Sequence, residues 1–131
     1  EKEVVEADST KAIMPEKDVE QHLITLSNLL EEERLFLDPN LCLKLLAEKI
    51  SLHPNKLSWL LNEHIGKNFN EYINTFRLET FKTKALDPSN SHLTILGLAY
   101  ESGFNSKTVF NKFFKTMEGM TPKAWLKSNK R

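Results

Sequence analysis

Apolar residues recur at helical spacing along most of the chain, and no segment keeps the alternating pattern of a strand. The first stripe comprises Val19, Leu23, Leu26 and Leu30, with Asp18 placed to cap the helix. The few Gly and Pro residues fall between such stretches and do not form hairpin pairs. The pattern therefore predicts an all-α protein.

Six more helices are predicted after this first one. The second helix starts at Pro39-Asn40 and the third covers residues 54–65. The fourth is a long helix over residues 71–86, capped by Asn70. The next helix starts at Ser91 or Thr94 and ends at Gly103, another is capped by Asn105 or Ser106 and closed by Gly119, and Thr121-Pro122 starts the last. The inward positions are Leu43, Leu46, Ala47, Ile50, Leu57, Leu60, Leu61, Ile65, Ile95, Leu98, Ala99, Phe110, Phe113, Phe114 and Met117.

An internal repeat is the strongest signal in the sequence. With an offset of 52 residues, Leu46 falls on Leu98 and Ala47 on Ala99; after one inserted residue, further pairs match at an offset of 53. These pairs are Leu57 with Phe110, Leu61 with Phe114, Gly66 with Gly119 and Tyr72 with Trp125. Each copy has two helices, a small Ala for their close approach and a short turn, which is the pattern of a helix-turn-helix.

The repeat divides the chain into segments. We expect a disordered linker over 1–17, an acidic N-terminal helix over 18–37, a first helix-turn-helix unit over 38–70, a linker helix over 71–87 and a second unit with a basic end over 88–131. The predicted fold class is all-α, with two homeodomain-like three-helix units joined by the linker helix.

The second copy reads LAYESGFNSKTVFNKFFKTMEGMTP, with Ala99, Gly103-Phe104, Phe110-x-x-x-Phe114-Lys115 and Gly119-Met120-Thr121-Pro122 in register. These residues, with Tyr72-Ile73-x-x-x-Arg77 in the linker helix, resemble the AraC-type DNA-binding domain over about two-thirds of the chain. The resemblance implies two helix-turn-helix units that bind double-stranded DNA and regulate transcription. The sequence departs from the family pattern at His53, Trp59 and Leu96-Gly97.

Charge is distributed unevenly although the net charge is zero. Residues 1–37 hold 4 basic and 10 acidic side chains, whereas residues 105–131 hold 7 basic side chains and one acidic side chain. Such asymmetry is typical of a chain with a polyanion-binding end and a solvated tail.

Candidate DNA contacts lie on the outward faces of the second helix of each unit. In the first unit these positions are Asn55, Lys56, Ser58, Trp59 and Asn62, and in the second unit the resemblance places base contacts on Lys107, Thr108, Asn111 and Lys112. Trp59 has two interpretations, because it could cover thymine methyl groups or lie half-buried against the linker helix. Phosphate contacts are expected from Lys56, Asn105, Ser106, Lys115 and Lys123. A solvated helix face is the alternative for all these positions.

No metal or cofactor is expected, because the four histidines have no metal-site spacing. Cys42 is interpreted as a packing residue beside Leu43. Two rival functions are a helical protein-interaction module and an enzyme that uses Cys42. The resemblance also implies RNA polymerase as a partner and a sensory or dimerising region before Glu1. We expect this chain to lie in the cytoplasm with the DNA, and a membrane anchor upstream of Glu1 in the full-length protein is the alternative.

Overall fold

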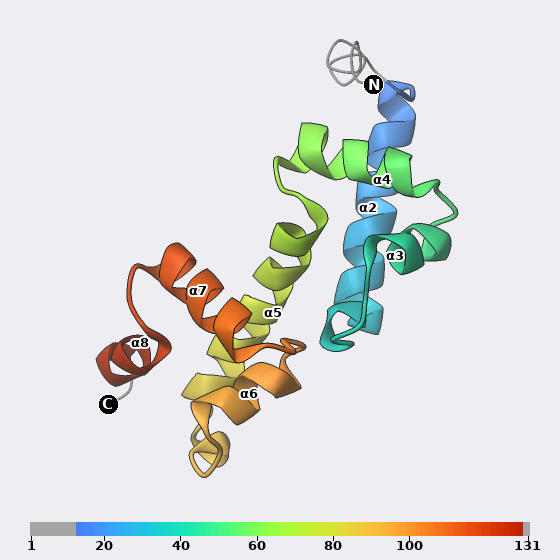
Figure 1. Ribbon diagram of the computed structural model, residues 1–131. Coiled ribbons are helices and arrows are strands. Elements are labelled where there is room, and N and C mark those ends of the chain that lie inside the picture. Colours follow the sequence, from blue (N-terminus) through green and yellow to red (C-terminus); the bar gives the residue numbers. More distant parts are fainter. Residues whose placement is uncertain (1–12, 130–131) are drawn as a thin grey trace. The chain divides into compact units, whose positions relative to one another are not determined.

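The computed structural model describes residues 13–129. These residues form two compact units, the first made of residues 13–35 and 41–72 and the second of residues 36–40 and 73–129. Every regular element in the described residues is helical, which confirms the predicted all-α fold class (Figure 1).

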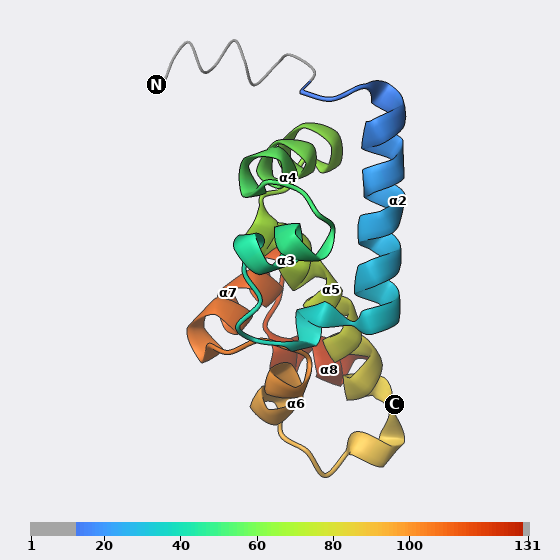
Figure 2. The ribbon, with the colours of Figure 1, turned by 90° about the vertical axis from the view of Figure 1, so that its right-hand side faces the viewer.

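The first unit contains α2 (Glu16–Glu33), α3 (Leu43–Lys49) and α4 (Pro54–Leu60), with α2 alongside the other two (Figures 1 and 2). Val19, Leu26 and Leu30 are buried on α2, as the helical stripe predicts. The helix differs from the prediction at both ends. It starts at Glu16, inside the stretch predicted to be a disordered linker, and it stops at Glu33 because Arg34 takes a left-handed conformation with φ of 53°. Residues 1–12 lie outside the described residues.

The helix predicted from Pro39-Asn40 starts later, as α3, with Cys42 at its N-cap. Cys42 is exposed, so its interpretation as a packing residue was wrong. The predicted inner positions Leu46, Ala47 and Ile50 are buried. The third predicted helix begins at Pro54 as expected, but after Leu60 its last turn widens into the π-helix η2 (Leu61–Ile65).

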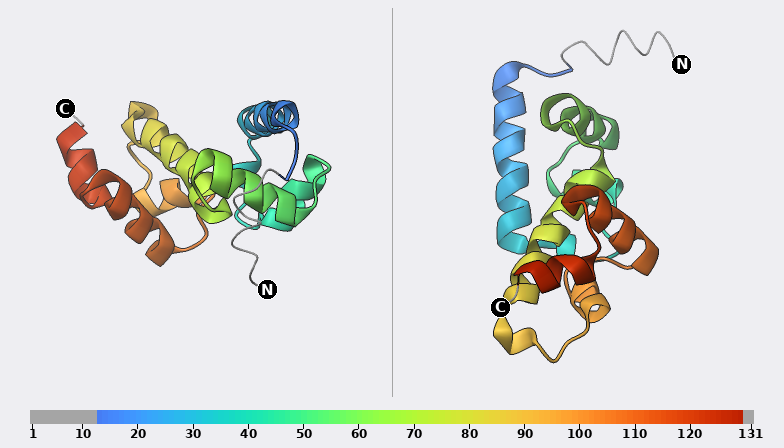
Figure 3. Two further views of the ribbon diagram at one scale, coloured as in Figure 1. Left: turned by 90° about the horizontal axis from the view of Figure 1, so that it is seen from above. Right: turned by 90° about the vertical axis from the view of Figure 1, so that its left-hand side faces the viewer.

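The second unit contains most of α5 (Phe69–Leu86) and the 3₁₀ turn η3 (Pro88–Asn90), followed by α6 (Ile95–Glu101), α7 (Lys107–Glu118) and α8 (Pro122–Asn129) (Figures 1 and 3). Residues 36–40 belong to it as well, and they include most of the 3₁₀ turn η1 (Leu35–Leu37). Its core consists of Leu78, Phe81, Ala85, Leu98, Ala99, Phe104, Phe110, Phe114 and Trp125. Ring pairs such as Phe81 with Phe110, at 4.9 Å between centroids, add edge-to-face contacts to this apolar burial.

Two sequence predictions in this part of the chain were wrong in detail. The cap of α5 is Asn68, not Asn70: the Asn68 side chain accepts from Glu71 N at 2.8 Å while the Glu71 carboxylate accepts from Asn68 N at 2.9 Å. Met117, predicted to point inward, is 48% exposed.

The repeat found in the sequence is present in backbone geometry. Ala47 O accepts from Leu52 N at 2.9 Å, and Ala99 O accepts from Phe104 N at 3.1 Å, an offset of 52 residues. Ser51 and Gly103 lie at matching positions and both have positive φ, of 57° and 110°. Both copies therefore turn between their helices in the same way, and the buried alanine of each lies directly at this turn.

Candidate nucleic-acid interface

Most exposed side chains of α7 are polar, although Val109 and Met117 are exposed as well, while Phe110 and Phe114 on the opposite face are buried. The helix is set at its start by Ser106, whose Oγ accepts from Val109 N at 3.2 Å. Five side chains predicted to contact DNA are exposed on it, namely Lys107, Thr108, Asn111, Lys112 and Lys115. This face therefore presents amide, hydroxyl and ammonium groups to solvent from a helix anchored by its aromatic side.

The cations on this face have no acidic partner. Within residues 13–129, Lys82 pairs with Glu79 and Glu118 and Lys84 with Glu101, whereas the lysines of α7 form no ion pair. Burial acts to lower the pKa of Lys82, but the Glu118 hydrogen bond at 3.0 Å and the charge of Glu79 outweigh it and raise that pKa above its usual value. The positive charges of the α7 lysines are therefore not balanced by an ion pair. Glu118, at the C-terminal end of the helix, is paired with Lys82.

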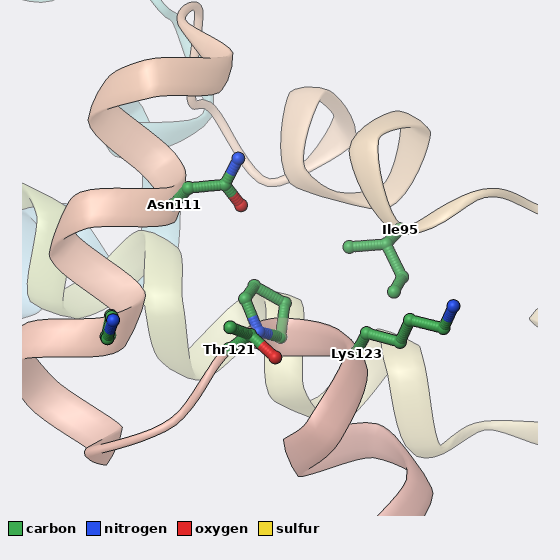
Figure 4. A pocket seen from close by; sticks show the side chains of 6 residues that line it. Ile95, Asn111, Thr121 and Lys123 are labelled. Carbon is green, nitrogen blue, oxygen red and sulfur yellow. The ribbon is translucent and has the colours of Figure 1, made fainter.

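A cavity of about 410 Å³ opens between α6, α7 and the beginning of α8. Figure 4 shows Asn111 on α7 and Ile95 on α6 beside this space, with Thr121 and Lys123 across from them at the start of α8. Lys115 and Pro122 complete the lining. The structure thus brings together three residues that the sequence assigned separately to DNA contacts: Asn111, Lys115 and Lys123.

The start of α8 is capped by its own residues. Pro122 occupies the first turn and has no N–H, Thr121 Oγ1 accepts from Ala124 N at 3.1 Å, and Thr121 O accepts from Trp125 N at 2.9 Å. Few backbone donors therefore remain there for an anion, and Lys123 is the charged group at this end of the helix. Thr121 was not predicted as a site residue, although the pair Thr121-Pro122 was recognised as the start of this helix.

The outward face of α4 and of the following η2, which holds Asn62, is less charged than that of α7. Asn55, Lys56 and Asn62 are exposed and Ser58 is half-buried. The Asn62 amide nitrogen donates to Ser58 O at 2.9 Å and to Ser58 Oγ at 3.3 Å. Its donors are therefore engaged within the helix, so a bidentate contact to a base requires a change of side-chain rotamer.

Trp59 packs inside the first unit, where it is 8% exposed and its ring meets the His64 ring edge-on at 5.0 Å between centroids. Of its two interpretations, burial is the one found, and the prediction that Trp59 contacts bases is corrected accordingly. Residue spacing alone placed it on the outward face. The widening of the helix after Leu60 was not visible in the sequence pattern.

Asn105, predicted as a phosphate contact, also makes a contact within the second unit. Its amide nitrogen donates to Pro39 O at 3.2 Å, a residue 66 positions earlier in the chain. The phosphate contact was expected from the backbone N–H groups at the start of this helix, and it stays a prediction. The neighbouring Ser106 is half-buried, and its hydroxyl acts as the cap of α7.

Neither a metal centre nor a membrane span is found within residues 13–129. No three His, Cys, Asp or Glu side chains in that range gather closely enough to hold a metal ion. None of the helices there combines the length and apolar character that crossing a bilayer requires.

Comparisons with known proteins agree with this geometry. Residues 46–128 match a family described as a helix-turn-helix domain. The chain is 33% identical over 86 residues to uncharacterized HTH-type transcriptional regulators of Staphylococcus aureus strains COL and N315, a region covering 66% of this chain and 11% of each regulator. The chain therefore spans about a tenth of the length of these relatives.

Two solved structures share the fold. The C-terminal domain of the two-component response regulator yesN from Fusobacterium nucleatum superposes with a TM-score of 0.68 at 26% identity, over 81% of this chain and 98% of that one. A protein of unknown function from Listeria innocua gives a TM-score of 0.66 at 25% identity, over 80% and 93%. The paired helix-turn-helix units and the family match together define the class: the chain belongs to the AraC-type family of helix-turn-helix domains.

Proposed function

We propose that this chain is a sequence-specific double-stranded DNA-binding domain of a transcription regulator, with α7 and α4 entering successive major-groove segments. The observation that carries the proposal is the exposed face of α7, where Lys107, Lys112 and Lys115 have no acidic partner. Major-groove reading requires a helix that presents hydrogen-bonding side chains to base edges. The second helix of this helix-turn-helix is capped and carries amide and hydroxyl groups between its lysines. The family is one of DNA-binding domains and is not an enzyme class.

The two kinds of side chain on α7 have separate roles in this proposal. Thr108 and Asn111 read base edges, because a hydroxyl can donate or accept and an amide can pair with adenine N6 and N7. Lys107 and Lys112 contact guanine or phosphate. Lys115 and Lys123, beside the cavity at the start of α8, bind one stretch of the phosphate backbone.

The first unit contributes mainly base reading. Its second helix offers Asn55, Ser58 and Asn62 with a single lysine, Lys56. Glu63 follows and adds negative charge beside it. We therefore assign most of the electrostatic affinity to the second unit.

Three wider proposals rest on the resemblance and on the length of the relatives. The full-length protein carries a sensory or dimerising region outside this domain, contacts RNA polymerase and acts where the DNA is, in the cytoplasm. The relatives' much greater length supports the first of these.

A salt titration of duplex binding tests the proposal. The affinity of the unaltered chain for double-stranded DNA should fall by about 0.9 in log K per neutralised phosphate for each log unit of salt. Lys115→Ala should reduce this slope by about one. Lys17→Ala, which removes an exposed lysine from α2, is the matched control and should leave the slope unchanged. A salt-independent affinity, or no binding at low salt, would contradict the proposal.

A further inference from the structure

The segment 36–40, called the strap here, lies in sequence between α2 and α3 but belongs to the second unit. Phe36 is 4% exposed and stacks on Phe76 of α5, at 5.6 Å between ring centroids. Asp38 closes a tight turn by accepting from Asn40 N at 2.9 Å. The strap is thus a folded part of the second unit and not a free connection.

Arg77 on α5 binds the strap with its guanidinium group. Its Nε donates to Phe36 O at 2.7 Å and its Nη2 to Asp38 O at 3.0 Å, while Nη1 donates to Asn74 Oδ1 at 3.0 Å. All three nitrogens are therefore used, and the planar fork matches two carbonyls of one short turn. Burial lowers the pKa of Arg77, an effect that the nearby Asp38 opposes.

The strap also packs against the turn before α7. Gly103 has φ of 110°, and a Cβ atom at this position would lie 2.2 Å from Phe36 O. The strap backbone therefore occupies the space that a side chain at residue 103 would need. Two residues later, Asn105 donates to Pro39 O at 3.2 Å. Asn105 immediately precedes Ser106, the cap at which α7 begins.

We propose that the strap, Arg77 and Asn105 position the DNA-reading helix α7, by fixing the turn from which that helix starts. Arg77 and Asn105 act through the strap and do not themselves contact DNA. The inference rests on the proposed function, because it explains how the base-reading residues Thr108 and Asn111 are aligned.

The proposal predicts a split between specific and non-specific binding. Base contacts depend on accurate alignment, whereas lysine contacts to phosphate tolerate displacement. The specific duplex is one that the unaltered chain selects from a randomised library. The affinity of Asn105→Ala and of Arg77→Lys for this duplex should fall about fivefold or more, which is the loss expected for one misaligned base contact. Affinity for a scrambled duplex, and its salt slope, should stay unchanged. A variant that was merely less stable would lose both affinities together.

Asn90→Ala is the matched control, because Asn90 also donates a side-chain amide hydrogen to a backbone carbonyl of the second unit, Lys84 O, at 3.0 Å. It should leave both affinities unchanged. A second measurement needs no DNA: backbone amide chemical shifts of residues 108–112 in α7, beyond the direct neighbours of residue 105, should move in Asn105→Ala and stay fixed in Asn90→Ala. This keeps the proposal testable if Arg77→Lys does not fold.

The outcomes separate the two hypotheses. Failure of the unaltered chain to bind any duplex overturns the proposed function. The positioning role is overturned if the unaltered chain binds normally, folded Asn105→Ala has the same specific affinity, and the amide shifts in α7 do not move. This outcome leaves the proposed function intact.

Discussion

Cys42 and Thr94 occupy the same position in the two repeat copies, the N-cap before the first helix of each helix-turn-helix. Thr94 Oγ1 accepts from Gly97 N at 2.9 Å, whereas the Cys42 side chain makes no capping hydrogen bond. Both residues have extended backbone conformations, so a threonine at residue 42 fits without strain.

Cys42→Thr should therefore raise the free energy of unfolding by about 1 kcal/mol, and Thr94→Ala should lower it by a similar amount. Urea unfolding followed by circular dichroism measures both changes. Cys42→Ala, which supplies no oxygen acceptor, is the control for loss of the thiol. A Cys42→Thr chain no more stable than the Cys42→Ala chain would show that the cap position is not the cause.

Tyr72 is the residue whose titration reports on the first unit. Burial, aided by the charge of Glu31, raises its pKa from 10.0 to about 12. Because the folded state holds this proton more tightly than the unfolded state, the stabilisation is complete below pH 10 and is lost as the pH rises toward 12.

In Tyr100→Phe, which leaves Tyr72 as the remaining tyrosine, phenolate absorbance should thus appear close to pH 12 while the circular dichroism is still that of the folded chain. The full change at pH 10 in a folded chain would contradict the burial of Tyr72.

At the element scale, the sequence predicted which faces are buried better than where helices begin. The stripes containing Leu46, Ala47, Phe110 and Phe114 are buried because helical periodicity directly encodes a face. Helix ends depend on caps with several candidates in a row, so Asn68 was missed in favour of Asn70.

Contacts between distant segments were beyond reach of the sequence pattern. Nothing local to Asn105 shows that its amide binds Pro39, and the helical spacing of Trp59 is that of an outward residue. Trp59 was assigned to DNA for this reason, and Asn105 because it lies at the N-terminus of a helix. The polar face of α7 was predictable because its candidates share one helix, and their role in DNA binding stays a prediction.

In α7 and α8, base reading and phosphate binding are assigned to different residues. Asn111→Ala should cost about 1–3 kcal/mol on the preferred duplex and relax discrimination at one base position, because a bidentate amide contact to adenine is lost. Lys123→Ala should weaken binding to all duplexes alike and lower the salt slope by about one. Binding titrations on the preferred and a scrambled duplex measure both effects, with Lys17→Ala as the control. Uniform loss of affinity in both variants would contradict the division of roles.

At the scale of the whole molecule, the repeat places two DNA-binding units in one chain. If both units engage one site, binding by the first raises the effective concentration of the second, so affinity for the full site exceeds that of either unit. The basic second unit then supplies most of the electrostatic attraction, and the amides of α4 extend the sequence that is read.

Selection of duplexes from a randomised library, followed by sequencing, tests whether both units read DNA sequence. The unaltered chain should enrich one motif with two separated blocks of preferred bases. Asn111→Ala should lose preference within one block and Asn55→Ala within the other, while Lys17→Ala keeps the whole motif. Enrichment of no motif, or the same motif in all four chains, would contradict the account that α7 and α4 read DNA sequence.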